Sequence, residues 1–170
     1  MHEVGAFIVR GEEGEALWAL NTFTRVLARS GSTGGAMGAW EWWGTAAGNP
    51  PLHVHHGEDE AFFLLEGGVT FEVAAERIAA SAGDLVFAPR GLPHRFAVTS
   101  AEARMLVLAV PGGFERFFSE VGRPAERREL PPPEEPDAAE LARRAGSYRV
   151  EILGPPIQGS SEGQPEGNGS

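Results

Sequence analysis

Four of the five histidines in this 170-residue sequence lie in two short segments. His53 and His55 are separated by one residue on a predicted strand, and side chains two apart on a strand project from the same face. Glu60 follows five residues after His55, across a predicted turn at 56–59, and His94 begins a later predicted strand. This spacing allows three imidazoles and one carboxylate to point into a single cavity.

Three neutral imidazoles and a carboxylate are a ligand set for one divalent transition metal ion, namely nickel, iron, manganese, cobalt, copper or zinc. The same four ligands accept several of these ions, so the sequence does not identify the metal. Cysteine is absent, which excludes a thiolate site. In an octahedral arrangement, four protein ligands would leave two positions for water, oxygen or substrate, as a catalytic site requires.

The polar residues around these ligands have simpler interpretations. A His-x-His pair alone is weak evidence, because surface pairs are common. His56 has the opposite strand parity to His55 and should point outward. Glu58 and Asp59 are expected to be turn carboxylates, although either could orient an imidazole from behind the site. His2 is expected to be a solvated terminal residue.

The elements that must position the four ligands are predicted to be short strands. The 23 glycines and 13 prolines favour many strands joined by tight turns. Strands are predicted over residues 4–10, 16–20, 22–27, 36–43, 52–56, 60–65, 69–73, 77–80, 84–88, 94–98 and 104–110. Their regular spacing predicts an all-β, antiparallel sandwich or barrel.

Two helices are predicted after the strands. The apolar stripe of the first helix predicts packing on the outside of the barrel or on a partner subunit; its members are Phe114, Phe117, Phe118 and Val121. The second helix runs from Asp137, a plausible N-cap, to about Ala145. A single domain over 1–157 would then hold a barrel core at about 36–110 and a helical extension at about 112–146. Residues 158–170 contain only Gly, Ser, Glu, Gln, Pro and Asn and are expected to be a disordered tail.

Charge and hydropathy exclude several classes of partner. The net charge of −10 and pI of about 4.9 argue against a nucleic-acid partner and against binding to anionic membranes. No apolar stretch approaches the roughly 20 residues that span a bilayer, and charged residues interrupt any signal-peptide pattern near the N-terminus. We therefore expect a cytoplasmic protein with a small-molecule partner. Barrel edge strands and the apolar N-terminal segment predict a homodimer.

The two histidine segments resemble the two motifs of the cupin superfamily. The first motif matches at Gly48, His53, His55, Glu60 and Gly67, with four residues instead of five before His53. The second motif matches at Gly83, Pro89, Gly91 and His94, with Val98 in place of an Asn that is not a metal ligand in the family. The resemblance implies an antiparallel double-stranded β-helix, the jelly-roll or cupin barrel, with His53, His55, Glu60 and His94 as metal ligands.

A narrower resemblance extends from about Trp40 to Pro156. The strings PPLHVHHGEDEAFFLLEG, PRGLPHRF, PGGFERFF and EILGPP are similar to bacterial single-domain cupins of the quercetin 2,3-dioxygenase-like group. This resemblance implies a metal-dependent dioxygenase that cleaves a flavonol or related aromatic, enolic substrate with O2, with Glu60 as ligand and proton acceptor. Since one fold serves many reactions, two alternatives stay open. One is another metal-dependent cupin enzyme, a cyclase, isomerase or decarboxylase on a polyketide-like or keto-acid substrate; the other is a non-catalytic small-molecule-binding cupin.

Aromatic residues are candidates for a substrate pocket. Trp40 and Trp42 share strand parity, so the pair could line a flat, apolar pocket for an aromatic substrate, with core packing as the simpler interpretation. Four phenylalanines are expected in the core, with one or two at the pocket mouth: Phe62, Phe71, Phe87 and Phe96. Arg90 is interpreted either as a contact for an anionic substrate group or as an exposed turn arginine.

Overall fold

The computed structural model describes residues 4–158. The predictions of a disordered tail, apart from Gln158, and of a solvated His2 concern residues outside the described ones. The described chain contains twelve strands and two α-helices, with a single turn of 3-10 helix at Ala46–Gly48. The strands are β1 (Glu15–Ala19), β2 (Thr22–Ala28), β3 (Gly38–Gly44), β4 (Leu52–His55), β5 (Asp59–Glu66), β6 (Gly68–Val73), β7 (Glu76–Ser81), β8 (Leu85–Ala88), β9 (His94–Val98), β10 (Ala103–Val110), β11 (Arg123–Pro124) and β12 (Val150–Gly154).

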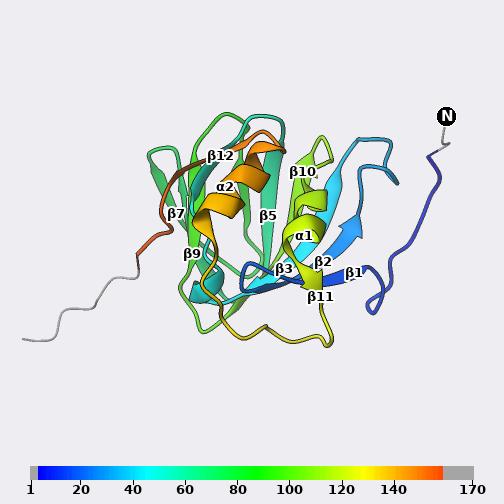
Figure 1. Cartoon of the computed structure of the whole chain (residues 1–170), viewed down its shortest axis with the longest axis horizontal. Coiled ribbons are helices and arrows are strands. Elements are labelled where there is room, and N and C mark those ends of the chain that lie inside the picture. Colours follow the sequence, from blue (N-terminus) through cyan, green and yellow to red (C-terminus); the bar gives the residue numbers. More distant parts are fainter. Residues whose placement is uncertain (1–3, 159–170) are drawn as a thin grey trace, which may run out of the picture.

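The strands form two antiparallel sheets that enclose the interior of the molecule (Figure 1). The seven-stranded sheet has the order β11-β1-β2-β3-β10-β5-β8, and the five-stranded sheet has the order β12-β4-β9-β6-β7. Most of the strands that the sequence predicts lie within a few residues of their predicted bounds. The predicted fold class, an all-β double-stranded β-helix with short C-terminal helices, is confirmed.

Alternation along the strands explains why the two sheets pack face to face. In β10, Met105, Val107 and Ala109 are buried while the residues between them are partly exposed. The same pattern in β6 buries Phe71 and its neighbours two residues away. Because side chains alternate across a strand, these buried sets point into one shared core.

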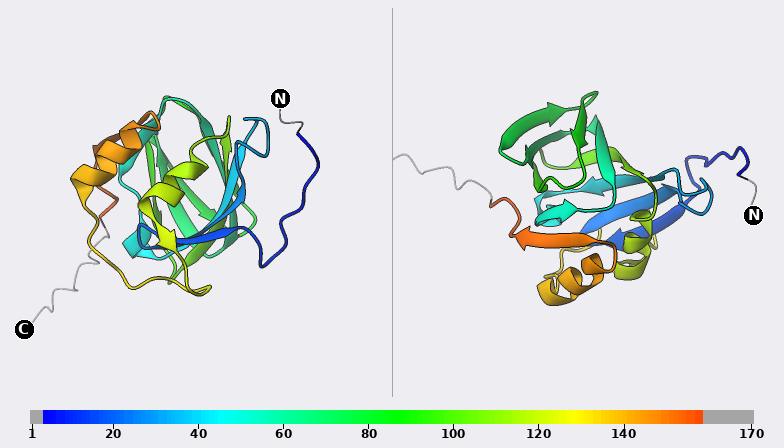
Figure 2. Two further views of the ribbon diagram at one scale, coloured as in Figure 1. Left: turned by 45° about the vertical axis from the view of Figure 1, so that its right-hand side comes forward. Right: turned by 90° about the horizontal axis from the view of Figure 1, so that it is seen from above.

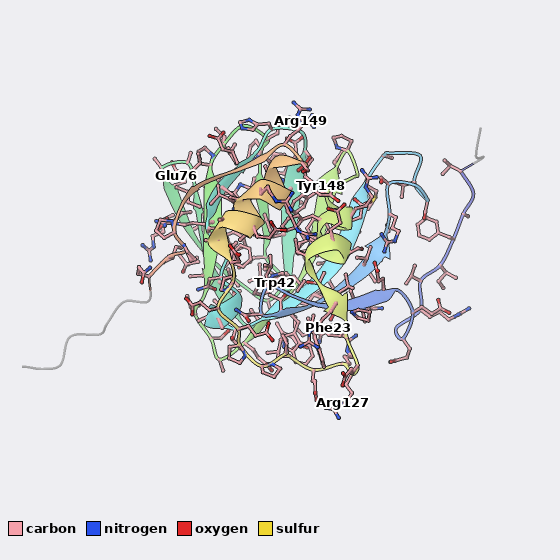
Figure 3. All side chains as sticks on the ribbon, in the orientation of Figure 1. Phe23, Trp42, Glu76, Arg127, Tyr148 and Arg149 are labelled. Carbon is pink, nitrogen blue, oxygen red and sulfur yellow. The ribbon has the colours of Figure 1, made fainter. Side chains whose placement is uncertain are left out.

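Helices α1 (Glu115–Val121) and α2 (Ala138–Gly146) lie together on one side of the barrel (Figure 2). The buried carboxylate of Glu115 accepts hydrogen bonds from the amides of Ser30 (2.7 Å) and Gly113 (2.6 Å), which fixes α1 to the loop before β3. The side chain of Asp137 accepts a hydrogen bond from the Glu140 amide at 3.0 Å, so the predicted N-cap of α2 is confirmed. Tyr148 lies just after the end of α2 (Figure 3), and its ring packs against Phe114, which directly precedes α1.

Three predictions about these elements are wrong. Residues 4–10 form no strand: Phe7 and Ile8 are exposed there, and no neighbouring strand pairs with the segment. Strand β12 was not predicted, although it pairs with β4 over Val150↔His55 and Ile152↔His53. Phe87 is 54% exposed rather than buried, because it points outward from β8, while Val86 and Ala88 point into the core.

Within residues 4–158, neither helix has the length and apolar character that crossing a bilayer requires. The homodimer stays a prediction.

Candidate metal centre

Three strands from the two sheets bring the four predicted ligands together. His53 and His55 lie on β4, His94 on β9 and Glu60 on β5, and His53 pairs directly with His94 in the β4–β9 register. One ligand atom from each residue lies within 4.8 Å of the corresponding atoms of the other three. His55, Glu60 and His94 are buried, and His53 is partly exposed toward the cavity described below.

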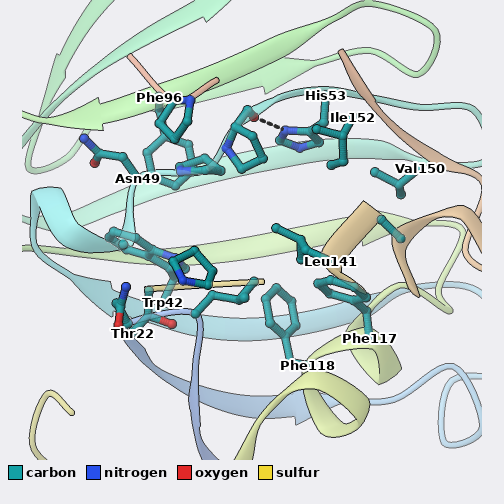
Figure 4. Close-up of a pocket in the computed structure, with 18 of the residues that line it drawn as sticks. Thr22, Trp42, Asn49, His53, Phe96, Phe117, Phe118, Leu141, Val150 and Ile152 are labelled. Carbon is teal, nitrogen blue, oxygen red and sulfur yellow. Dashed lines mark hydrogen bonds between the residues drawn. The ribbon is translucent and has the colours of Figure 1, made fainter. Parts of the chain in front are cut away.

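Each imidazole is held through its Nδ1 atom. His53 Nδ1 donates to the carbonyl oxygen of Pro51 at 2.7 Å, marked by the dashed line in Figure 4. His94 Nδ1 faces the carbonyl oxygen of Leu92 at 3.3 Å. His55 Nδ1 donates to the carboxylate of Glu58, which comes from the turn between β4 and β5. Since carbonyl and carboxylate oxygens only accept, a neutral His53 or His55 carries its proton on Nδ1 and its lone pair on Nε2, whereas His94 also makes a hydrogen bond between Nε2 and Glu60 Oε2 at 2.9 Å.

Two Nε2 atoms face the Glu60 carboxylate. Glu60 Oε2 lies 2.9 Å from His94 Nε2 and 3.1 Å from His55 Nε2. His55 Nε2 is buried and makes no hydrogen bond among the described residues. Lone pairs that converge at these distances repel one another unless a proton or a cation lies between them, and a buried polar atom without a partner is costly. This donor set therefore fits a metal ion: the cluster could hold one.

The pKa values in the cluster show how it is balanced without a cation. Burial lowers the pKa of His53 to about 3, and the neighbouring His94 and His55 add to this effect. Burial alone would also lower the pKa of His55, but Glu60 and Glu58 together raise it above its usual value. Burial alone would raise the pKa of Glu60, but the histidines, His55 first, lower it to about 2. The carboxylate is thus ionised at neutral pH, as a ligand must be.

The cluster opens onto a cavity of about 230 Å³ that reaches from the barrel interior to the C-terminal helices (Figure 4). All four predicted pocket residues, Trp40, Trp42, Phe62 and Phe96, lie on its wall, and all four also belong to the hydrophobic core. The wall contains ligands His53, His55 and Glu60 but, among the described residues, no arginine. Because the sequence also contains no lysine, the described part of the wall offers neither an arginine nor a lysine to a substrate in this cavity.

The other polar residues singled out in the sequence have defined places. His56 points outward as predicted, and its Nε2 lies 3.1 Å from Glu151 Oε2 on the surface. Arg90 is paired with Asp59, whose carboxylate accepts from the backbone amide and the guanidinium of Arg90 at 2.8–3.1 Å. Of the two turn carboxylates, therefore, Glu58 rather than Asp59 contacts an imidazole.

Sequence reasoning missed the part of the cavity wall that the C-terminal region supplies. The sequence predicts that the stripe of Phe114, Phe117 and Phe118 packs on the outside of the barrel or on a partner subunit. Helix α1 does pack on the barrel, but these three side chains line the cavity. Leu141 of α2 and Ile152 of β12 complete that wall. The alternation Val150-Glu151-Ile152 is a signal that could have predicted β12 and its inward-facing side.

The fold and this site define a cupin-type β-barrel with a His3Glu cluster. A family model described as "Cupin domain" matches residues 45–111, the span that contains both histidine motifs. Over these residues the chain matches the cupin domain, and the comparisons support a cupin superfamily protein.

Individual similar proteins agree with this assignment. The chain is 28% identical over 126 residues to quercetin 2,3-dioxygenase of Bacillus subtilis, a match that covers 74% of this chain and 37% of that enzyme. The matched region thus spans little more than a third of that enzyme's length. Two solved structures share the fold, each with a TM-score of 0.56 and 17% identity over 65% of this chain: KdgF from Halomonas sp., covered to 97%, and an RmlC-like cupin from Shewanella frigidimarina, covered to 96%.

Proposed function

We propose that this protein is a metal-dependent dioxygenase that cleaves a flavonol or a related aromatic, enolic substrate with O2. The observation that carries the proposal is the juxtaposition of the His3Glu cluster with a cavity walled by aromatic side chains. Similarity to quercetin 2,3-dioxygenase supports it.

The composition of the cavity wall favours a neutral aromatic substrate over a carboxylate. Trp42 and Phe96 pack edge to face with ring centroids 5.2 Å apart and offer flat apolar surface to a ligand. A keto acid or dicarboxylate would lose its hydration on entry and meet no arginine among the described wall residues. The proposed metal ion could pair with one carboxylate, but a second one would stay unpaired at the apolar wall, which argues against a dicarboxylate substrate.

The proposal gives the four cluster residues separate tasks. His53, His55 and His94 would hold the ion through Nε2, since each Nδ1 is already engaged. A bound divalent ion would supply Lewis-acid chemistry, which lowers the pKa of a substrate hydroxyl. Glu60 would be a ligand and would accept that hydroxyl proton on a carboxylate oxygen. Because its pKa is about 2, Glu60 is a weak base and needs an acidified hydroxyl as its partner.

Oxygen consumption tests the proposal. Chelator-stripped protein is reconstituted separately with Fe, Mn, Ni, Co and Cu and assayed with quercetin and a small flavonol panel. We expect metal-dependent oxygen uptake that disappears in a His94→Ala variant. Metal-loaded protein that consumes no oxygen with any ion would overturn the proposal and leave an oxygen-independent enzyme or a binding protein. A Glu60→Gln variant that keeps its metal and full turnover would remove the proton-acceptor role.

Two neighbouring tryptophans provide a matched test of the pocket. Trp42 lines the cavity, whereas Trp43 points outward and donates to Glu102 at 3.0 Å. Trp42→Leu should raise KM for a flavonol about tenfold or more, because one aromatic wall is lost. Trp43→Leu should leave KM unchanged. Equal effects of the two changes would show that the substrate does not use this cavity.

A further inference from the structure

The three histidines of the cluster are oriented by different kinds of group. His53 and His94 face backbone carbonyls, but His55 is bound by the side chain of Glu58. Glu58 lies in the turn before β5 and is buried, with 8% of its surface exposed. A buried carboxylate is costly unless a specific partner compensates it.

No other interaction in the described part of the chain explains why Glu58 is buried. Its side chain makes its one hydrogen bond there to His55 Nδ1 and forms no ion pair with an arginine. The nearby Arg90 is instead paired with Asp59, at 3.0 Å between Nη2 and Oδ2. This turn therefore directs Glu58 inward to a histidine and Asp59 outward to a guanidinium group.

We propose that Glu58 is the positioning residue of the metal centre. As an acceptor-only group, it holds the proton of His55 on Nδ1 and directs the Nε2 lone pair into the cluster. With Glu60 it also supplies two negative charges, which match the charge of a buried divalent ion and reduce the desolvation cost of binding it. This inference rests on the proposed metal site but not on dioxygenase chemistry.

The chain contains a matched control for the Glu58–His55 pair. His56, the next residue, pairs with Glu151 across 3.1 Å, and the two side chains are 47% and 61% exposed. Both pairs join a glutamate to a histidine: His55 is the last residue of β4, and His56 directly follows it. Only the Glu58 pair reaches the cluster, so a change at Glu151 reports what the loss of a surface pair does by itself.

The first experiment measures affinity for Co2+ and Zn2+ by competition with a chelator. Glu58→Ala should weaken binding 10- to 100-fold, the usual effect of removing a group that orients a ligand. Glu58→Gln keeps an acceptor oxygen but not the charge, so it should recover part of that loss. The visible absorption of the Co2+ protein should change in Glu58→Ala, while Glu151→Gln should match the wild type in both measurements. Unchanged affinity in Glu58→Ala would overturn the proposal.

The second experiment needs no metal. Long-range 1H–15N NMR of metal-free protein at alkaline pH, where the imidazoles are neutral, reports which nitrogen of His55 carries the proton. The wild type and Glu58→Gln should show Nδ1–H, and folded Glu58→Ala should lose that preference. The same tautomer in all three proteins would contradict the orienting role of Glu58. A wild type that binds no metal would refute the metal site instead, so the two failures are distinguishable.

Discussion

Two buried glutamates on opposite faces of the same sheet have very different surroundings. Glu41 on β3 and Glu60 on β5 are each 3% exposed, and β10 separates their strands. Glu41 projects outward and accepts hydrogen bonds at 2.7–3.2 Å from three guanidinium groups: Arg25, Arg104 and Arg128. Glu60 projects inward and meets three histidines instead. Both carboxylates have lowered pKa values despite burial, Glu41 through Arg104 and Arg25 and Glu60 through His55 and His94.

The difference shows which of the two clusters has donor atoms for a metal ion. Arginines are permanently charged and only donate, so the Glu41 network is complete within the protein. Neutral histidines present lone pairs, and His55 Nε2 has no hydrogen-bond partner in residues 4–158. The Glu60 cluster therefore has a donor set that could hold a cation. A buried carboxylate by itself identifies neither situation; the type of partner does.

Exchange of each carboxylate for its amide should separate the two clusters most strongly. Glu60→Gln removes a charged ligand and should weaken binding of a divalent metal ion at least 100-fold, while Glu41→Gln should bind as tightly as the wild type. Isothermal titration of chelator-stripped proteins measures both. Similar metal affinities in the two variants would contradict the distinction.

For the stability of the metal-free protein, we expect a change at Glu41 to have a larger effect than a change at Glu60. Glu41→Ala leaves three arginines without their shared partner, and we expect the free energy of unfolding to fall by about 2–3 kcal/mol, less than for a fully buried network because Arg128 and Arg104 are partly exposed. Urea unfolding followed by circular dichroism measures this loss. A loss below about 0.5 kcal/mol would show that the network does not contribute to stability.

The histidine cluster should also make metal-free protein sensitive to acid. An unfolded histidine binds its proton near pH 6.5, whereas the pKa of folded His53 is about 3, so the unfolded state holds one more proton between these values. Stability should therefore decrease as the pH falls through this window, by at most about 1.4 kcal/mol per unit. Glu60 adds to the loss from about pH 4.3 down to about pH 2. His55, with its raised pKa, is protonated in both states below pH 6.5 and adds no slope there.

Urea midpoints of the wild type and His53→Gln across this pH range test the assignment. The variant should show a smaller decrease between about pH 6.5 and pH 4.5, above the range in which Glu60 contributes. If both proteins show the same decrease, a different group is responsible.

The smallest effect is expected at the surface pair of His56 and Glu151. His56→Ala should change the free energy of unfolding by about 0.5 kcal/mol or less, because both side chains are solvated. Its metal affinity should equal that of the wild type. A loss of metal binding in His56→Ala would mean that the face on which a histidine lies does not decide whether it is a metal ligand.

Local rules predicted the central part of this molecule well. The two-residue period of β4 places His53 and His55 on the inner face and His56 on the outer face, as the sequence indicated. The strands that carry Glu60 and His94 lie close to their predicted bounds. The side-chain contact of Glu58 was one of two open possibilities, because sequence spacing does not decide which of two adjacent turn carboxylates points inward.

The regions that sequence reasoning missed depend on long-range partners. Residues 4–10 have an apolar pattern but find no strand to pair with, so they stay extended and exposed. Strand β12 forms by pairing with the edge of β4, which lies almost a hundred residues earlier in the chain. Phe87 is exposed because it lies on the outer face of β8, and which face of a strand meets the core depends on the packing of the whole barrel. The same limitation hid the contribution of α1 and α2 to the cavity wall.

The central claim is that His53, His55, Glu60 and His94 together bind one metal ion. Crystals of protein reconstituted with a single transition metal, measured at the absorption edge of that metal, test it most directly. We predict one anomalous difference peak per chain, within bonding distance of the Nε2 atoms of the three histidines and a carboxylate oxygen of Glu60. A cluster without a peak in metal-saturated crystals, or a peak bound elsewhere, would contradict the claim.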